Sequence, residues 1–430
     1  MSNQNNYEEY FRQIVGYENV KNELCKIADI LHDTEKYRTH GVNTPRGLLL
    51  YGEPGVGKTT MAECLIQASK REVFVCRKSS SEASFIRNIK ACFDKAKDAC
   101  PSIVFLDDMD KFSNDDEKHP NSDAFVTIQA CIDSLKKKDV VVISTVNSIS
   151  AIPRSLLREG RFDRRIKIEN PTVKDAAVII AHYLENKQCV KDIDTLQIAR
   201  LMSGSSCAAL ETIVNEAGIH SVYSGKELID LDDIVEACLE IFFHAPRSQE
   251  KKEDGLSTDY HEAGHVVARE VLTPSSVALV STRISRGQDS GITVFSKDMS
   301  AVDLFSAKRL ILTCLAGKAA VEVALGISDM GSGKDIDEAC YIAKRVLSFS
   351  CSLGFDKYLS DIYDDYDESG RKEASVITLI ELCYLEAIKL LSDNRDFLED
   401  VAEALLQKET LLEADIAEIR NRHKIIPFTA

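Results

Sequence analysis

LLLYGEPGVGKTT, residues 48–60, contains the spacing G-x-x-x-x-G-K-T, with an apolar run typical of a β-strand before it and a helical pattern after it. Glycines here let backbone N–H groups point at phosphate oxygens, and the dipole of the following helix adds positive potential. Lys58 can reach the β- and γ-phosphates, and Thr59 can hold Mg²⁺. A glycine-rich turn beside a surface lysine is the plain alternative, but the full motif in this setting predicts a nucleotide site. The predicted contacts are Gly52, Glu53, Pro54, Gly55, Val56, Gly57, Lys58, Thr59 and Thr60.

Short β-rich runs recur on both sides of this loop. They are Gly47–Tyr51, Val73–Cys76, Ile103–Leu106, Val140–Thr145 and Arg165–Ile168. The segments between them are long enough for helices. Such alternation predicts an α/β fold over residues 8–173, with a parallel sheet that carries helices on both faces.

The pattern changes after this region. Residues 174–243 read as helices without a convincing strand. Residues 244–257 are polar, charged and broken by proline and glycine, which predicts a linker between domains. Residues 258–430 read as a second, mainly α-helical domain, in which ALVSTRI (278–284) and GITVFS (291–296) form a hairpin of two strands.

Acidic and amide side chains follow two of the predicted strands. IVFLDDMD, residues 103–110, contains a strand that ends in Asp107 and Asp108. Asp107 can hold the hydration shell of Mg²⁺, and Asp108 can polarise the attacking water. A pair of turn aspartates after a strand is the alternative. Asn147 ends a later strand and can orient water against a γ-phosphate. The arginine-rich stretch 154–165 then supplies either a finger for transferred charge or a solvated salt-bridge face.

STDYHEAGHVVAREV, residues 257–271, carries an H-E-x-x-H motif in a helical pattern. His261 and His265 lie four residues apart on one helix face, so both imidazoles can bind one Zn²⁺. Glu262 is placed to take a proton from water, whose pKa the metal lowers. Two surface histidines are the plain alternative. A third ligand is missing, and Asp335 reads equally well as that ligand or as a helix N-cap with Glu338 completing a capping box.

Composition excludes several classes of protein. The chain has 53 basic and 69 acidic residues, a net charge of −16, which argues against a broad nucleic-acid surface. Its 13 cysteines include no C-x-x-C pair and fit the reduced thiols of a cytosol. No signal peptide and no apolar run of about 18 residues is visible. We therefore expect a soluble, cytoplasmic chain without a membrane segment of its own.

These motifs together resemble a known architecture. Four segments resemble the AAA ATPase module: Gly52–Thr60, Ile103–Asp110, Ser144–Asn147 and Leu156–Asp163. The resemblance implies ATP with Mg²⁺, Asn147 as a sensor, and Arg158 and Arg161 as arginine fingers that act on a neighbouring subunit's nucleotide. It also implies a ring, usually of six subunits, and makes residues 174–243 the helical lid.

The order of the two motifs resembles the FtsH family of membrane-bound, ATP-dependent zinc metalloproteases over nearly the whole chain. YHEAGHVVA is similar to the family's zinc motif, and GSGKDIDEACYIAKRV is similar to the later segment that carries its third ligand. The resemblance implies that His261, His265 and Asp335 bind zinc and that Glu262 is the catalytic acid/base. GITVF is similar to the family's substrate-side edge strand, which could pair with an extended peptide.

Three features depart from the family. The ATPase module begins without transmembrane helices before it. Asp108 stands where the family has glutamate and is one methylene shorter, so we expect slow hydrolysis, because a misplacement of about 1 Å can cost on the order of 100-fold in rate. The pore-loop region, residues 78–92, has no glycine, and its one aromatic residue, Phe85, is favoured as a helix core residue over a substrate grip.

The prediction is a soluble, ring-forming, ATP-dependent zinc metalloendopeptidase that degrades unfolded or loosely folded proteins, as a homo-hexamer or as a mixed ring with related subunits. The alternative is an ATP-binding switch or scaffold with slow turnover and little processive proteolysis, favoured by Asp108 and the altered pore loop. A remodelling chaperone with a structural zinc site is the weakest interpretation, because such sites usually have four protein ligands.

Overall fold

The chain forms two compact units, Met1–Ile229 and Asp230–Ala430. The structure is a computed structural model, and it describes residues 7–42, 44–78, 82–112, 123–135, 138–246, 255–283, 291–296, 301, 303–328, 331–349 and 366–428. Within these ranges, no helix combines the length and the apolar character needed to cross a membrane.

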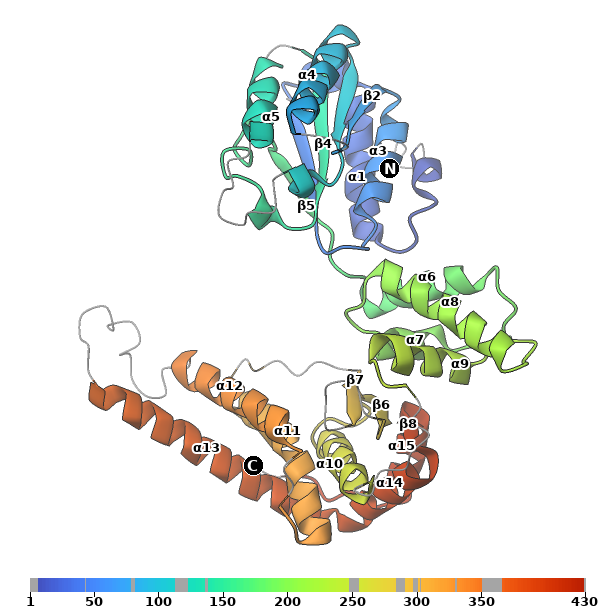
Figure 1. The fold of residues 1–430 in the computed structure, drawn as a ribbon, viewed down its shortest axis with the longest axis vertical. Coiled ribbons are helices and arrows are strands. Elements are labelled where there is room, and N and C mark those ends of the chain that lie inside the picture. The colour runs from blue at the N-terminus through green and yellow to red at the C-terminus, as the bar shows by residue number, and fades with distance from the viewer. Residues whose placement is uncertain are drawn as a thin grey trace. The chain divides into compact units, whose positions relative to one another are not determined.

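A five-stranded parallel sheet forms the centre of the first unit (Figure 1). Its strands are β1 (Gly47–Tyr51), β2 (Glu72–Cys76), β3 (Ser102–Leu106), β4 (Val140–Val146) and β5 (Arg164–Lys167). They lie in the order β2-β3-β4-β1-β5, and each starts within one residue of its predicted position. Strands β1, β3 and β4 are buried almost throughout, as expected for a sheet covered on both faces. The predicted α/β fold is therefore confirmed.

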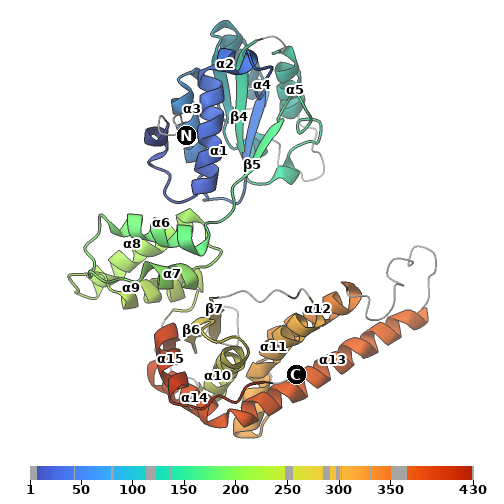
Figure 2. The same ribbon diagram turned by 180° about the vertical axis from the view of Figure 1, so that it is seen from behind.

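Helices cover both faces of this sheet. The helices are α1 (Glu18–His32), α2 (Thr34–Arg38), α3 (Lys58–Ser69), α4 (Glu82–Asp98) and α5 (Asp123–Ser134), with short 3₁₀ turns at Glu8–Phe11, Met109–Phe112 and Ile149–Ala151. Helix α3 packs on β1 and β4 and is itself covered by α1 (Figure 2). Helices α4 and α5 pack together on the other face, where Phe93 and Phe125 join Val104 and Val142 in one core cluster.

Phe85 belongs to this same core. Its side chain is 1% exposed, and its ring meets that of Phe112 edge-on at 4.8 Å. The interpretation of Phe85 as a core residue of α4 is confirmed, so it is not available to grip a substrate. Residues 79–81, which precede α4 in the predicted pore-loop region, lie outside the described residues.

Three further helices complete the first unit: α6 (Val173–Leu184), α7 (Thr195–Leu201) and α8 (Cys207–Tyr223). Each begins after a side chain that accepts a hydrogen bond from the first turn, namely Thr172, Asp194 and Ser206. These N-caps satisfy backbone N–H groups that have no partner within the helix. The stretch predicted to be helical, residues 174–243, is described throughout and consists of helices joined by short loops, with one isolated bridge between Cys189 and Ile229.

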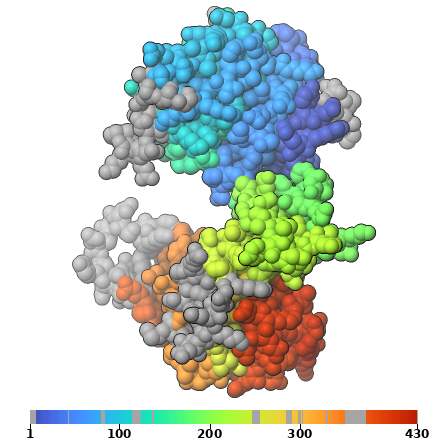
Figure 3. Space-filling model, turned by 45° about the vertical axis from the view of Figure 1, so that its right-hand side comes forward, coloured from blue at the N-terminus to red at the C-terminus, as the bar shows by residue number. Residues whose placement is uncertain are grey.

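The second unit is mainly helical, as predicted. Its elements are α9 (Leu231–Ala237), a π-helical turn (Cys238–Phe242), α10 (Gly255–Leu272), β6 (Val277–Ser281), β7 (Ile292–Phe295), α11 (Leu304–Leu325), α12 (Gly333–Phe349), α13 (Tyr366–Asp393), α14 (Arg395–Lys408), β8 (Thr410–Leu412) and α15 (Glu413–Asn421). Strands β6 and β7 form the predicted antiparallel hairpin. The short strand β8 was not predicted, and it pairs with the side of β6 that β7 leaves free. The C-terminal segment that contains β8 and α15 lies within the surface coloured red in Figure 3.

The division between the units falls before α9, whereas the predicted lid extends to residue 243. A buried ion pair joins α9 to the second unit: Arg283, just after β6, donates to both carboxylate oxygens of Glu236 on α9 at 2.6 and 2.8 Å. The predicted limits of the lid and linker, whose residues 247–254 lie outside the described residues, stay predictions.

Helices α10 and α11 pack unusually closely, and this contact positions the metal motif. A Cβ at Gly264 of α10 would lie 2.4 Å from the carbonyl oxygen of Ala316 and 2.6 Å from Cβ of Ala320, both on α11. Glycine at the fourth position of HEAGH therefore lets α11 approach the helix that carries both histidines.

Candidate nucleotide site and metal centre

The phosphate loop turns between β1 and α3, and two of its glycines are required by the backbone. Gly57, the N-cap of α3, has a φ of 89°, in the left-handed region that favours glycine. A Cβ at Gly52 would lie 1.9 Å from the carbonyl oxygen of Ile168. These two positions allow the sharp turn that aims the start of α3 into the loop.

Lys58 is held inside this loop. Its ammonium donates to the carbonyl oxygens of Gly52 and Glu53 at 2.9 and 2.8 Å and to Oδ1 of Asn147 at 2.9 Å. Burial lowers the pKa of Lys58, while the nearby charges of Asp108 and Asp110 raise it. The structure thus brings the predicted lysine and the predicted sensor Asn147 together.

Thr59 and Asp107 also meet, as a magnesium site requires. The Thr59 hydroxyl donates to Oδ1 of Asp107 at 3.0 Å, and Thr145 donates to the same oxygen at 2.9 Å. Arg77, which the sequence did not single out, donates to Oδ2 of Asp107 at 3.1 Å. A hydroxyl and a carboxylate are hard oxygen donors of the kind Mg²⁺ takes, so these residues fit the ion.

Asp108 and Asn147 are each bound by a charged neighbour. Asp108 has a left-handed φ of 52°, and its Oδ2 accepts a hydrogen bond from Lys111 at 2.6 Å. The Asn147 amide donates to Oδ2 of Asp110 at 2.8 Å. Asp110 therefore orients the predicted sensor, while Lys111 holds the carboxylate that is predicted to act on water.

We predict that Asp108→Glu raises ATP turnover about tenfold, since the added methylene extends the carboxylate and a shortfall of about 1 Å costs on the order of 100-fold. Steady-state phosphate release measures this, with Asp108→Asn as the matched control, which should lower turnover. Unchanged turnover in Asp108→Glu would show that the length of the side chain does not limit hydrolysis.

The two predicted arginine fingers differ in their surroundings. Arg161 donates to both carboxylate oxygens of Asp133 at 3.0 and 2.8 Å and also to the Ser155 carbonyl. Arg158 is exposed. In the described part of the chain neither side chain has a hydrogen bond to the phosphate loop.

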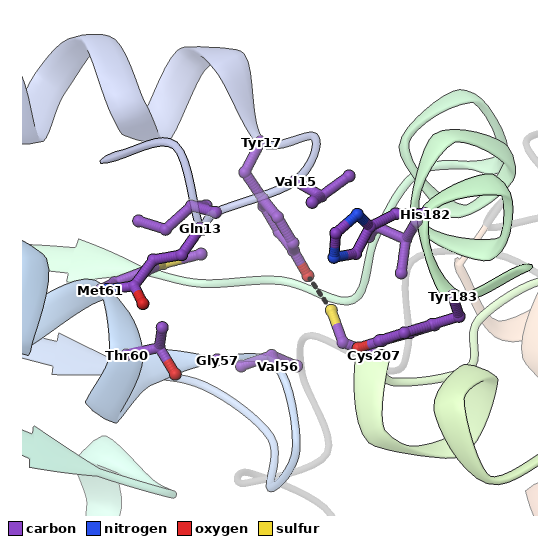
Figure 4. A pocket seen from close by; sticks show the side chains of 12 residues that line it. Gln13, Val15, Tyr17, Val56, Gly57, Thr60, Met61, His182, Tyr183 and Cys207 are labelled. Atoms are coloured by element: carbon purple, nitrogen blue, oxygen red, sulfur yellow. Dashed lines mark hydrogen bonds between the residues drawn. The ribbon is translucent and has the colours of Figure 1, made fainter. Parts of the chain in front are cut away.

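A cavity of about 160 Å³ opens beside the phosphate loop (Figure 4). Its walls come from the segment before α1, the start of α3, and helices α6 and α8. The lining residues are Gln13, Ile14, Val15, Tyr17, Val56, Gly57, Thr60, Met61, Ile179, His182, Tyr183 and Cys207. The Tyr17 hydroxyl donates to the Glu169 carbonyl at 2.9 Å and lies 3.5 Å from Sγ of Cys207. Sequence reasoning missed this cavity because its walls are far apart in the chain.

The metal motif forms a tight cluster of three donors. Nε2 of His261 lies 3.1 Å from Oδ2 of Asp335 and 3.1 Å from Nε2 of His265, and the His265–Asp335 distance is 3.4 Å. Ligand atoms about 2.1 Å from a tetrahedral zinc ion lie about 3.4 Å apart. The three side chains therefore fit Zn²⁺.

Contacts behind the cluster orient its ligands. Nδ1 of His265 lies 2.9 Å from the Thr313 carbonyl on α11. A carbonyl only accepts, so Nδ1 carries the proton and Nε2 faces the cluster. Burial lowers the pKa of His265, but the hydrogen bond and charge of Asp335 outweigh burial and raise this pKa to about 9. A cation bound to Nε2 would displace the second proton of the imidazolium, the one on Nε2, and would leave the Nδ1 proton bonded to the Thr313 carbonyl.

Gly317 of α11 forms the wall opposite the histidines. A Cβ at this position would lie 2.6 Å from Nε2 of His261 and 2.6 Å from Nε2 of His265. Only glycine leaves this space open, which is independent support for an ion between the rings. The sequence carried a weak signal, since a glycine within an apolar helix usually has a packing or functional reason. Asp335 lies in the first turn of α12, which begins at Gly333, so it is inside the helix and not at its N-cap.

Glu262 lies beside this cluster in a pocket of about 470 Å³. The side chain is 2% exposed, and its Oε2 accepts a hydrogen bond from the Thr293 hydroxyl on β7 at 2.7 Å. The pocket is lined by the three donors and Glu262, by Phe243, by residues of β7 and by residues of α11 and α12. The Glu262 carboxylate, the three donor side chains and strand β7 thus line one cavity.

Comparison with known proteins agrees with both sites. Residues 48–170 match the ATPase family associated with various cellular activities (AAA), and residues 247–419 match peptidase family M41. The chain is 30% identical to the "ATP-dependent zinc metalloprotease FtsH" of Mycoplasma genitalium, an alignment that covers 97% of this chain and 63% of that protein. It is 29% identical to "FtsH 2" of Phytoplasma mali, with 97% and 64% covered.

The similarity extends to a shorter relative. The chain is 28% identical to "FtsH 2" of Thermoanaerobacter, which it covers to 82%, with 94% of this chain aligned. The chain spans a little less than two thirds of the length of the Mycoplasma and Phytoplasma relatives. This chain therefore carries an AAA match followed by a peptidase M41 match, and it is similar over nearly its whole length to proteins named FtsH.

Proposed function

We propose that this chain is an ATP-dependent zinc metalloendopeptidase. The observation that carries the proposal is the cluster of His261, His265 and Asp335, with donor atoms 3.1–3.4 Å apart and the Glu262 carboxylate in the same pocket. The same polypeptide also has a phosphate loop, the Thr59–Asp107 pair that suits Mg²⁺, and a cavity beside the loop. Zinc, ATP and Mg²⁺ are the cofactors that these residues suit.

The peptidase residues have separate roles in this proposal. His261, His265 and Asp335 hold the metal, which when bound acts as a Lewis acid on the peptide carbonyl and lowers the pKa of water. Glu262 takes a proton from water and returns it to the leaving amine. Strand β7, at the edge of its sheet, pairs with the main chain of an extended peptide beside Glu262.

The residues of the nucleotide site also have separate roles in this proposal. Lys58 and the loop glycines bind the phosphates, Thr59 and Asp107 hold Mg²⁺, and Asn147 orients water. The 160 Å³ cavity takes the base. Asp108 polarises the attacking water, and Arg158 and Arg161 act on the nucleotide of a neighbouring subunit in a ring of six copies or of mixed subunits.

Substrates in this proposal are unfolded or loosely folded proteins, because Phe85, the one aromatic residue of the predicted pore-loop stretch, is buried in the core. Residues 8–173 and 174–243 act as the ATPase and its lid, and residues 258–430 act as the peptidase. The free cysteines in the described part of the chain suit a reducing, cytoplasmic compartment.

Cleavage of a labelled, unfolded protein by the zinc-loaded chain tests the proposal. The assay runs with ATP, with a non-hydrolysable analogue and without nucleotide. Glu262→Gln is the control, because it keeps the size of the side chain and removes the base; we expect a loss of at least about 100-fold. Cleavage should require ATP hydrolysis.

The other outcomes separate the two halves of the proposal. Cleavage that is indifferent to nucleotide would leave a peptidase without a working motor. No cleavage under any condition would favour the switch or scaffold alternative, which is not favoured now because such a protein has no chemical need for the metal cluster and Glu262 together.

A further inference from the structure

Strand β7 lies along the helix that carries the metal motif and contacts it at two points. The Thr293 hydroxyl donates to Oε2 of Glu262 at 2.7 Å. Two residues further along the strand, the Phe295 ring lies 4.5 Å from the guanidinium carbon of Arg269, one helix turn beyond His265. Thr293 and Phe295 share one face of the strand, since side chains alternate. This face is therefore aligned with α10 over two turns of the helix.

The approach of β7 also confines Glu262 sterically. A Cβ at Gly291, just before the strand, would lie 2.8 Å from Cγ and 3.0 Å from Cδ of Glu262. The Glu262 stem is thus packed against backbone, and its carboxylate is bound by a side chain two residues further on. Among the described residues, Thr293 is the one side chain with a hydrogen bond to this carboxylate.

The chemistry of this bond assigns different tasks to the two carboxylate oxygens. A carboxylate only accepts, so the Thr293 hydroxyl is the donor and Oε2 is occupied. Oε1 is left for the proton of the reacting water. A hydroxyl at Oε2 holds the carboxylate in one orientation, which matters because a misplacement of about 1 Å can cost on the order of 100-fold in rate.

We propose that Thr293 is a positioning residue for the peptidase reaction, which fixes the orientation of Glu262 from the strand that pairs with the substrate. This inference rests on the proposed peptidase function. It adds that one four-residue strand, β7, both pairs with the substrate and orients the Glu262 carboxylate. Thr293 is held in place for this role because its strand is paired with β6.

Three variants of the full zinc-loaded chain test this role. Thr293→Val keeps the shape and removes the hydroxyl, and we expect kcat for an unfolded substrate to fall about 10- to 100-fold with KM and zinc content unchanged. Thr293→Ser keeps the hydroxyl and should restore kcat to within about threefold. Thr282→Val is the matched control: Thr282 follows β6 and donates to the Glu409 carbonyl, so its loss should leave kcat unchanged.

A melting experiment on the zinc-free chain gives a readout that does not depend on activity. Thr293→Val should lower the melting temperature by about 3 °C, because Glu262 loses its partner in a buried site. In a Glu262→Ala background the same change should cause no decrease, because the hydroxyl then has no carboxylate to bind. Equal decreases in both backgrounds would mean that Thr293 does not hold Glu262.

The remaining outcomes distinguish this inference from the proposed function. Unchanged kcat in Thr293→Val, loss of zinc, or failure of Thr293→Ser to restore kcat would each contradict the positioning role. No cleavage by the unsubstituted chain would contradict the proposed function, and the melting experiment would then decide by itself whether Thr293 holds Glu262.

Discussion

Replacing Gly317 with alanine is expected to lower zinc affinity by at least about 100-fold and to remove peptidase activity with it. The new Cβ would lie 2.6 Å from Nε2 of both His261 and His265, well inside van der Waals contact. The atom has no room to move, because it is fixed to the backbone of α11, which is packed closely on α10. Either the imidazoles rotate away from Asp335 or the methyl group fills the position of the ion.

Metal content after dialysis, together with a competition titration against a chelator, measures this effect. Gly255→Ala is the matched control in the same unit, because no atom of the described residues lies within 4 Å of a Cβ placed there. That variant should keep its zinc. Retention of zinc by Gly317→Ala at wild-type affinity would mean that the histidines can shift together and that the close approach is not required.

Replacing Arg158 with alanine is expected to lower ATP turnover by about 1,000-fold, the low end of the range for an arginine finger. Arg158 is exposed, so its loss should leave the melting temperature unchanged. Arg161→Ala should also slow turnover. It removes the bidentate ion pair with Asp133, however, and should therefore also lower the stability of the folded chain. The two variants are thus separated by phosphate release measured together with thermal melting.

A mixing experiment tests whether Arg158 acts between subunits. A Lys58→Ala chain has a defective nucleotide site but an intact arginine, whereas Arg158→Ala has the reverse. Mixed rings should therefore recover part of the turnover that each variant alone lacks. If mixing restores nothing, or if Arg158→Ala is fully active, the proposed role in trans is wrong.

Much of the fold followed from local patterns. The five parallel strands and the hairpin begin within about one residue of their predicted positions, because each strand is a short apolar or β-branched run between helix-length segments. Strand β8 was missed, since three residues carry too little periodicity to be detected. The placement of α9 was also not predictable, because the Glu236–Arg283 pair joins residues that are 47 positions apart.

Site residues that depend only on local geometry could be identified from the order of the amino acids. His261 and His265 share a helix face because four residues make about one turn, and the phosphate loop needs only its own glycines, lysine and threonine. The roles of Lys58, Thr59, Asp107 and Glu262 remain proposals. In the structure Lys58 contacts Asn147, Thr59 contacts Asp107, and Glu262 lies in the pocket of the three metal donors.

Contacts between segments that are distant in the chain become visible only in the folded structure. From its own surroundings in the sequence, Asp335 was equally open as ligand or cap, and only the resemblance to a known family implied a ligand. The packing of α10, α11 and α12 brings it to His261, 74 residues away in the chain. The same packing makes Gly317 necessary, and the pairing of β7 with β6 brings Thr293 to Glu262. The periodicity of apolar residues in the sequence does not predict such contacts. They depend on how whole helices and strands pack against one another and not on the order of neighbouring residues.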